Sequence, residues 1–202
     1  MRRVAVAFVL VLLAAGIAGS ALGAEYRRYV VRGEGISIAV PASWAATEGG
    51  VSGAVLDRLA RENPKLAPFV RGLGGANSPM KFIALDRRVR DDFATNVNVV
   101  VVPVPSGIRF AQYRQTLLAE LRPIVGSAPI EQSVATIHGV AAARFRYRLR
   151  LTYGRTITVQ TLQYAFLRPG RSVVVTYTTL PKLSSTYAVT FKRSAASIRF
   201  AS

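Results

Sequence analysis

Hydrophobic residues in the first half of the chain recur with the periods of both strands and helices. Apolar residues alternate with small or polar ones over residues 35–40, which predicts a half-buried strand that ends at Pro41. The other elements expected in this half are helices over residues 51–62 and 66–73 and strands over residues 80–85 and 96–102.

The second half of the chain predicts one long helix followed by a meander. Apolar residues recur at intervals of three and four after Ser106, which can cap the helix, and Pro123 should end it near Arg122. Short turns then separate several strands, a pattern typical of antiparallel pairing. These strands are expected at residues 133–137, 140–152, 156–166 and 172–179, and a last helix at residues 185–196.

One of these strands alternates arginines with large apolar residues. Residues two apart on a strand share a face, so four guanidinium groups should line one face at intervals of about 7 Å while the other face is buried. The arginines are Arg144, Arg146, Arg148 and Arg150, and the residues between them and after them are Phe145, Tyr147, Leu149 and Leu151.

The following strand supports this arrangement. A three-residue loop at residues 153–155 would place Arg148 beside Gln160, so that the two strands agree on which face is polar. After Gln160 the alternation changes, and apolar side chains take over within residues 162–166. This change predicts either a bulge or a strand that passes under a helix.

The N-terminus has the organisation of a secretory signal peptide. Arg2 and Arg3 precede an almost purely apolar run over residues 4–18, and small residues follow over residues 19–24. We therefore expect cleavage near Gly23 or Ala24, and a secreted domain that comprises residues 25–202. The alternative is an uncleaved membrane anchor, which would need roughly 20 apolar residues.

Positive charge is concentrated in the last third of the chain. The full sequence has 27 basic and 10 acidic residues, a net charge of +17, and without the two arginines of the signal segment the net charge is +15. Residues 132–202 contain 11 basic residues, Arg155 among them, and no acidic residue. Such a distribution favours an anionic partner, because arginine binds phosphate and carboxylate groups in a bidentate manner.

Two interpretations of the arginine row remain open. The row can be a solvated face whose charge reflects a general preference for arginine, since the chain has 23 arginines and 4 lysines. It can also be a contact surface, because like charges on one strand face repel and a merely solvated face would usually include acidic residues.

The residues available for chemistry exclude several classes of site. One histidine and no cysteine rule out a Cys–His pair and a zinc site with several imidazoles. His138 precedes Gly139, where a turn residue with positive φ is expected. The Ser78 and Lys81 spacing resembles that of penicillin-interacting enzymes, but Pro79 and the expected strand make chance the better explanation.

An acidic cluster is the remaining candidate for a metal site. Asp86, Asp91 and Asp92 share one loop with three arginines, so mutual neutralisation on a solvated loop is favoured over cation binding. We therefore predict no catalytic residue, no metal site and no cofactor.

The motifs at the ends of these elements resemble the PsbP-like superfamily. The chain has an opening Gly-x-Ser-Ile-x-x-Pro-x-x-Trp pattern, an Asn-Val-Asn-Val strand, a long helix, a meander and a final Ser-Ile-Arg-Phe. The matched residues are Gly35, Ser37, Ile38, Pro41 and Trp44, residues 96–99 and residues 197–200. The chain departs from the family in its helical insertion at residues 51–73 and lacks the lipid-anchoring cysteine of LpqN-type members.

The resemblance implies an α+β fold, a single-domain α/β/α sandwich around a central antiparallel sheet. It also implies a binding or accessory module of the cell envelope, as in the bacterial LpqN and DcrB types, and not an enzyme. We expect an anionic lipid, polymer or protein partner at Arg144, Arg146, Arg148, Arg150 and Arg155, with peripheral membrane contact allowed and no nucleic acid. The alternatives are an interaction subunit with an apolar groove and, more remotely, an envelope hydrolase; the oligomeric state stays open.

Overall fold

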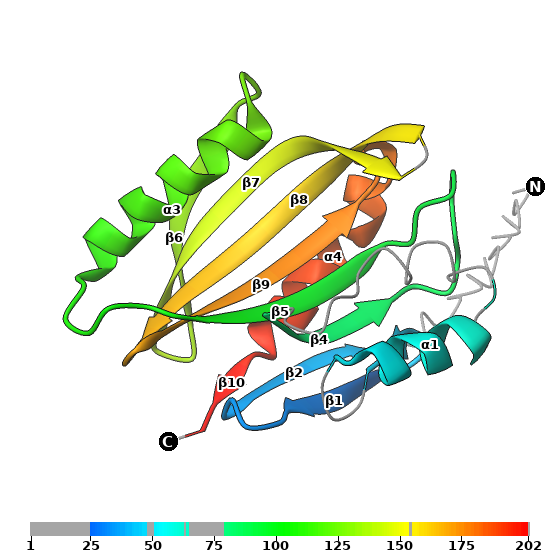
Figure 1. The fold of residues 1–202 in the computed structure, drawn as a ribbon, viewed down its shortest axis with the longest axis horizontal. Coiled ribbons are helices and arrows are strands. Elements are labelled where there is room, and N and C mark those ends of the chain that lie inside the picture. Colours follow the sequence, from blue (N-terminus) through cyan, green and yellow to red (C-terminus); the bar gives the residue numbers. More distant parts are fainter. Residues whose placement is uncertain (1–24, 48–50, 63, 65–78, 154, 202) are drawn as a thin grey trace, which may run out of the picture.

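The computed structural model describes residues 25–47, 51–62, 64, 79–153 and 155–201. A seven-stranded sheet forms its centre, with the order β3-β4-β5-β9-β8-β7-β6, and a smaller sheet has the order β1-β2-β10 (Figure 1). All neighbouring strands pair antiparallel. The strands are β1 Tyr26–Val31, β2 Ile36–Pro41, β3 Ala45–Ala46, β4 Met80–Leu85, β5 Asn96–Pro103, β6 Ile130–Ile137, β7 Val140–Tyr153, β8 Arg155–Arg168, β9 Arg171–Thr179 and β10 Arg199–Phe200. The helices are α1 Gly53–Glu62, α3 Phe110–Val125, the short 3₁₀ helix η2 Pro181–Leu183, and α4 Ser184–Ala196.

The sheet has helices on both faces, which confirms the predicted α+β sandwich. Helix α3 covers the β7 and β8 part of one face (Figure 1). Helix α1 packs on Ile83 and Leu85, which point away from the face of β4 that carries Phe82. That opposite face packs against α4 and the small sheet, and these together enclose the largest apolar core.

The meander is confirmed with small changes in its ends. Strand β6 begins at Ile130, three residues earlier than expected, because Ile130 pairs with Tyr147. Strand β1 was not predicted. Of its six residues only Tyr29 and Val31 are buried and Val30 is exposed, so its apolar residues do not alternate regularly, and its pairing with β2 stabilises it.

The predicted ends of α3 are wrong. The helix begins at Phe110 with Arg109 at its N-cap, not at Ser106, and it continues through Pro123 to Val125. A proline in the last turn removes only one backbone hydrogen bond. The helix then closes at Gly126, whose φ of 67° suits glycine and whose N–H donates to the carbonyl oxygen of Arg122.

Three sequence predictions fall outside the described residues. These are the signal segment at residues 1–24, the second helix at residues 66–73 and Ser78 of the Ser-x-x-Lys spacing. Within the described part of the chain, no helix has the length and apolar character that crossing a membrane requires.

Candidate binding site on the arginine face

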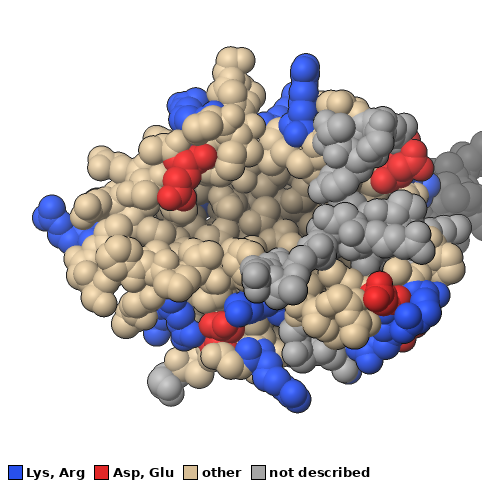
Figure 2. Space-filling model, in the orientation of Figure 1, with Lys and Arg blue, Asp and Glu red and all other residues tan. Residues whose placement is uncertain are grey.

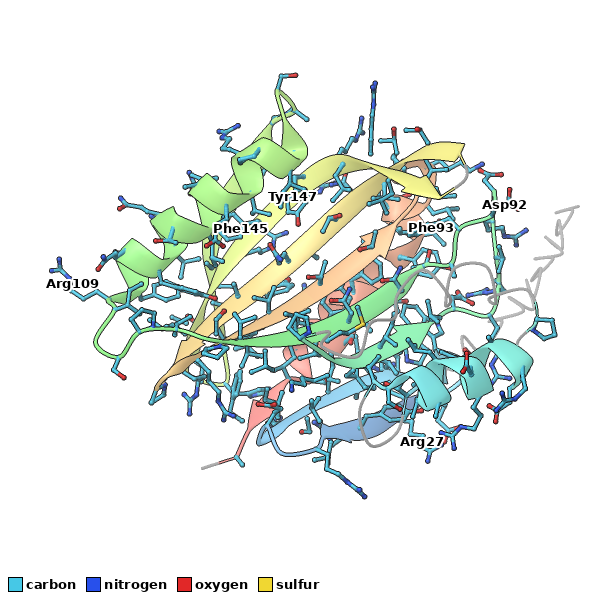
Figure 3. The ribbon with its side chains drawn as sticks, viewed as in Figure 1. Arg27, Asp92, Phe93, Arg109, Phe145 and Tyr147 are labelled. Atoms are coloured by element: carbon cyan, nitrogen blue, oxygen red, sulfur yellow. The ribbon has the colours of Figure 1, made fainter. Side chains whose placement is uncertain are left out.

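The two faces of β7 differ as the alternation predicts. Phe145 is 0% exposed and Tyr147 is also buried, and both pack under α3 (Figure 3). Burial raises the pKa of the Tyr147 hydroxyl to about 12, because the charged phenolate would lose its hydration there. The arginines lie on the opposite face, where Arg146, Arg148 and Arg150 are exposed and Arg144 is half-buried.

The pairing of β7 with β8 confirms the expected register. Arg148 lies opposite Gln160, and Arg150 lies opposite Thr158. The register continues without interruption past Gln160, so the bulge is excluded. The change to apolar residues has the second predicted cause, because Tyr164 belongs to the core that contains Phe191 of α4.

A groove lies where α4 crosses the arginine face, and we call it the α4 groove. Its volume is about 450 Å³. Its apolar lining residues are Ala135, Leu162, Tyr164, Ala188 and Phe191. Its polar and basic lining residues are Arg144, Arg146, Gln160, Thr179, Ser184 and Lys192. Tyr164 and Phe191 are buried and form the floor, while Arg146 and Lys192 are exposed and form the rim.

The groove exists because one side of α4 carries small residues. Ser184 and Ala188 are four residues apart, so they lie on the same side of the helix, and Lys192 follows after four more. The large side chains of α4, Tyr187 and Phe191, fill the core beneath the helix. Small residues facing Leu162 therefore leave space that a larger side chain would occupy.

Weak polar contacts hold the arginines of the row. Arg144 Nη1 donates to Ser133 Oγ at 3.5 Å, and Arg148 Nε donates to Gln160 Oε1 at 3.4 Å. Arg146 Nη1 lies 3.7 Å from Glu131 Oε2, and both side chains are largely exposed. Glu131 precedes the acid-free segment by one residue, so the row has one acidic neighbour on β6.

The structure divides the predicted site. Arg144 and Arg146 line the α4 groove, whereas Arg148 and Arg150 line a second hollow of about 520 Å³ beside the C-terminal end of α3. The side chain of Arg155 lies outside the described part of the chain. The sequence did not lead us to Lys192. Its spacing of four residues from Ala188, and of eight from Ser184, indicates that the three share one side of a helix.

Other basic residues of the last third have partners within the protein. Arg168 lies over the Phe200 ring at 5.0 Å, and Arg193 lies over the Tyr26 ring at 4.2 Å. Two more form ion pairs with acidic residues of the first half, Arg171 with Glu34 at 3.2 Å and Lys182 with Asp91 at 2.5 Å. On the side of the molecule seen in Figure 2, lysine and arginine side chains lie mainly around the rim. Of the basic residues of the last third, Arg144, Arg146 and Lys192 line the α4 groove instead.

The prediction that the acidic loop is solvated is wrong for Asp86. Its side chain is buried, accepts a hydrogen bond from the Tyr187 hydroxyl at 2.5 Å and pairs with Arg88 at 2.9 Å. Burial alone would raise the pKa of Asp86, but the hydrogen bonds from Arg88 and Tyr187 outweigh it and lower the pKa below 3.8. Asp86 thus anchors α4 above the sheet.

The other end of α4 is also held by polar contacts. His138 has the predicted positive φ, 48°, and its Nε2–H donates to the carbonyl oxygen of Ala196 at 2.7 Å. Ser197 Oγ accepts a hydrogen bond from the Ala39 N–H at 2.7 Å. Polar contacts near both ends thus hold α4 on the sheet. Within the described residues, no three His, Cys, Asp or Glu side chains lie together as a metal site would require.

No protein-family model matches this sequence, and no curated protein matches it. Solved structures do share its fold. Cyanobacterial PsbP from Synechocystis has a TM-score of 0.55 and 15% identity, over 92% of this chain and 98% of its own. LpqN of Mycobacterium tuberculosis, described as involved in cell envelope biogenesis, has a TM-score of 0.55 and 13% identity over 88% and 92%. The Ran-binding protein Mog1p of Saccharomyces cerevisiae has a TM-score of 0.51 and 10% identity over 87% and 95%. At these identities the likeness concerns architecture, and the chain therefore has the PsbP-like fold that its sequence motifs indicate.

Proposed function

We propose that this protein is a secreted, non-enzymatic binding protein that docks to an anionic component of the cell envelope through its arginine face. The observation that carries the proposal is the meeting of Arg144, Arg146 and Lys192 around one groove. No acidic residue is among the described residues that line this groove. Guanidinium and ammonium groups on a groove rim attract phosphate and carboxylate groups, and the walls of a groove focus that attraction.

The use of the other basic residues in the fold supports the proposal. If the charge were only a compositional habit, its pairing with acidic and aromatic groups should be similar everywhere. Arg168, Arg171 and Arg193 contact an aromatic ring or a carboxylate of distant segments. In the row, the contacts with the described residues are longer: Arg144 has a hydrogen bond of 3.5 Å to a hydroxyl, and Arg146 lies 3.7 Å from an exposed carboxylate of the neighbouring strand. A ligand would supply the anionic partner at Arg144.

The experiment is co-sedimentation with vesicles that contain anionic phosphatidylglycerol, compared with neutral phosphatidylcholine vesicles. Binding is measured at ionic strengths of about 0.01 M and about 0.15 M, between which the Debye length falls from about 30 Å to about 8 Å. We expect binding to the anionic vesicles that weakens steeply at the higher ionic strength. An Arg146→Ala and Arg148→Ala double variant should lose it.

A charge-matched control separates the arginine face from net charge. Arg109 and Arg122 are exposed on α3, on the other side of the sheet, and replacing both with Ala removes the same two charges. This control should bind nearly as well as the wild type. Equal losses in the two double variants, or binding that ignores salt, would contradict docking through the arginine face.

The apolar floor favours a second candidate function, an interaction subunit whose groove holds an apolar segment of a partner protein. Leu162, Tyr164 and Phe191 line the groove without any charge of their own. In that case the arginines are incidental, and binding to the partner would be independent of salt and unchanged by the loss of Arg146 and Arg148.

Export is tested separately. Expression of the full chain in a bacterial host, followed by fractionation and N-terminal sequencing, should give a protein outside the cytoplasm that starts at Ala24 or Glu25. A retained Met1, in the cytoplasm or in the membrane, would contradict secretion of a cleaved domain.

A further inference from the structure

We propose that the α4 groove binds a free amphiphile with one anionic headgroup and one hydrocarbon chain. This inference rests on the proposed function and names the ligand class of the same site. It follows from the order of the lining residues, which are buried and apolar at the floor and basic at the rim. A ligand that satisfies both zones must be apolar at one end and negatively charged at the other.

The headgroup would lie at the rim. Arg144 on β7 and Lys192 on α4 come from opposite walls, and Arg146 follows Arg144 on the same face of the strand. Two guanidinium groups and one ammonium group can hold a carboxylate or a phosphate with several charge-assisted hydrogen bonds. Both headgroups share this chemistry, and the experiment compares them.

The chain would lie along the floor. Leu162 and Tyr164 of β8 form one side and Phe191 of α4 the other, so a hydrocarbon chain would replace water on apolar side chains. The volume of about 450 Å³ is within the range of roughly 300–1,000 Å³ that holds one small ligand. One chain of medium length with a small headgroup fits this space better than a two-chain phospholipid.

Binding is measured by isothermal titration calorimetry on the mature wild-type protein, with dodecanoate and dodecyl phosphate below their micelle concentrations. We expect both to bind and dodecyltrimethylammonium, which has the same chain and the opposite charge, to bind at least about tenfold more weakly. In the series octanoate, decanoate and dodecanoate, each added methylene should strengthen binding by roughly threefold to fourfold while the groove has room. Equal affinity for the cationic amphiphile, or no dependence on chain length, would overturn the proposal.

A groove-filling substitution tests the location. Ala188 is exposed on α4 and lines the groove, so Ala188→Phe should fill the space and weaken dodecanoate binding at least about tenfold without disturbing the core. Val189 is 76% exposed and is not a lining residue, so Val189→Phe is the matched control and should keep wild-type affinity. The smaller Ala188→Leu substitution gives an intermediate loss. Similar affinities in Ala188→Phe and Val189→Phe would overturn the assignment to the groove.

A double variant at the groove rim tests the contacts proposed for the headgroup. An Arg144→Ala and Arg146→Ala double variant should weaken dodecyl phosphate binding at least about tenfold, whereas the Arg148→Ala and Arg150→Ala pair, at the second hollow, should change it less than about twofold. Equal losses in both pairs would show that net charge alone drives binding and would overturn the headgroup assignment.

The vesicle experiment separates this inference from the proposed function. If Ala188→Phe loses dodecanoate but still docks to anionic vesicles, the groove binds a free amphiphile and the face binds a surface. If the wild type docks to vesicles and binds no amphiphile, this inference fails and the proposed function stands. If Ala188→Phe loses both, the groove takes a lipid from the bilayer and the free amphiphile is overturned. If the wild type binds neither probe, both proposals fail.

Discussion

Residues of β7 alternate between two faces of the sheet, and the two faces lie in different environments. On the side of α3, Phe145 and Tyr147 pack under a helix whose Tyr113, Leu121 and Val125 are buried against the sheet. On the side of α4, the large apolar side chains of the helix lie in the core, and the small residues Ser184 and Ala188 line the groove together with Lys192. Alternation thus decides which residues share a face, and the helix above decides whether that face becomes core or an open groove.

The contacts that hold the two helices also differ. Helix α3 is held mainly by its apolar side, whereas α4 has polar anchors at Asp86, His138 and Ala39 as well as its buried aromatic residues. Polar anchors at the ends allow α4 to leave part of the sheet uncovered, because a helix that is fixed in this way does not need a continuous apolar seam. The groove is therefore compatible with a stable position of α4.

The largest expected effect comes from a substitution on the face of β7 that packs under α3. Phe145→Ala should lower the free energy of unfolding by roughly 3–5 kcal/mol, because it removes a fully buried ring and leaves a cavity. Arg146→Ala, the neighbouring residue on the exposed face, should change it by less than about 1 kcal/mol. Urea unfolding of both variants is the measurement. Comparable losses would contradict the division of β7 into a core face and a surface face.

A smaller loss is expected when the polar anchor of α4 is changed. Asp86→Asn should lower stability by about 1.5–3 kcal/mol at pH 7, because it weakens hydrogen bonds from Tyr187 and Arg88 to a charged group. The folded pKa of Asp86 lies below 3.8, so its carboxylate stabilises the wild type above that pH, and this contribution is lost as the pH falls through the folded pKa.

Unfolding measured from pH 7 down to pH 3 should therefore bring the wild type and Asp86→Asn closer together in stability at the acid end. Asp92→Asn, at an exposed turn residue, is the control and should leave this pH dependence unchanged. A constant difference between the wild type and Asp86→Asn across this range would contradict the role of the ionised carboxylate.

Tyr113→Phe tests the polar contact that holds α3 on the sheet. The Tyr113 hydroxyl shares a hydrogen bond with the buried hydroxyl of Ser172, so its removal leaves Ser172 without that partner and should cost about 1–2 kcal/mol. Because the anchor is single and neutral, the loss should be smaller than for Asp86→Asn. Thermal or urea unfolding of the two variants ranks them, and a larger loss for Tyr113→Phe would reverse the comparison of the two helices.

Local periodicity was enough to predict most of this fold. The Arg148 and Gln160 pair followed from alternation and loop length, both of which are properties of neighbouring residues. Strand β1 was missed because its stability comes from pairing with β2, while only two of its six residues are buried. The burial of Asp86 was missed for a similar reason, since Tyr187, which covers it, lies 101 residues away in the sequence.

The candidate site was predictable only in part. The arginine row on β7 is local and could be recognised, but the groove depends on where α4 crosses the sheet. That crossing adds Lys192 and Ala188 and separates Arg144 and Arg146 from Arg148 and Arg150. No pattern within one strand contains this information, because it is a property of the packing of two distant elements.

The smallest expected effect concerns Glu131, the acidic neighbour of the row on β6. An exposed ion pair such as that of Glu131 with Arg146 is worth about 0.2–1 kcal/mol, so Glu131→Gln should strengthen dodecyl phosphate binding by between about 1.4-fold and fivefold. The gain should shrink at higher ionic strength, because both side chains are exposed and screened by salt. Glu120→Gln removes the same charge from an exposed position on α3 and should leave the affinity unchanged. Equal gains in the two variants would mean that the ligand senses only the net charge of the molecule, whereas a gain confined to Glu131→Gln would mean that Arg146 itself exchanges its carboxylate partner for the ligand.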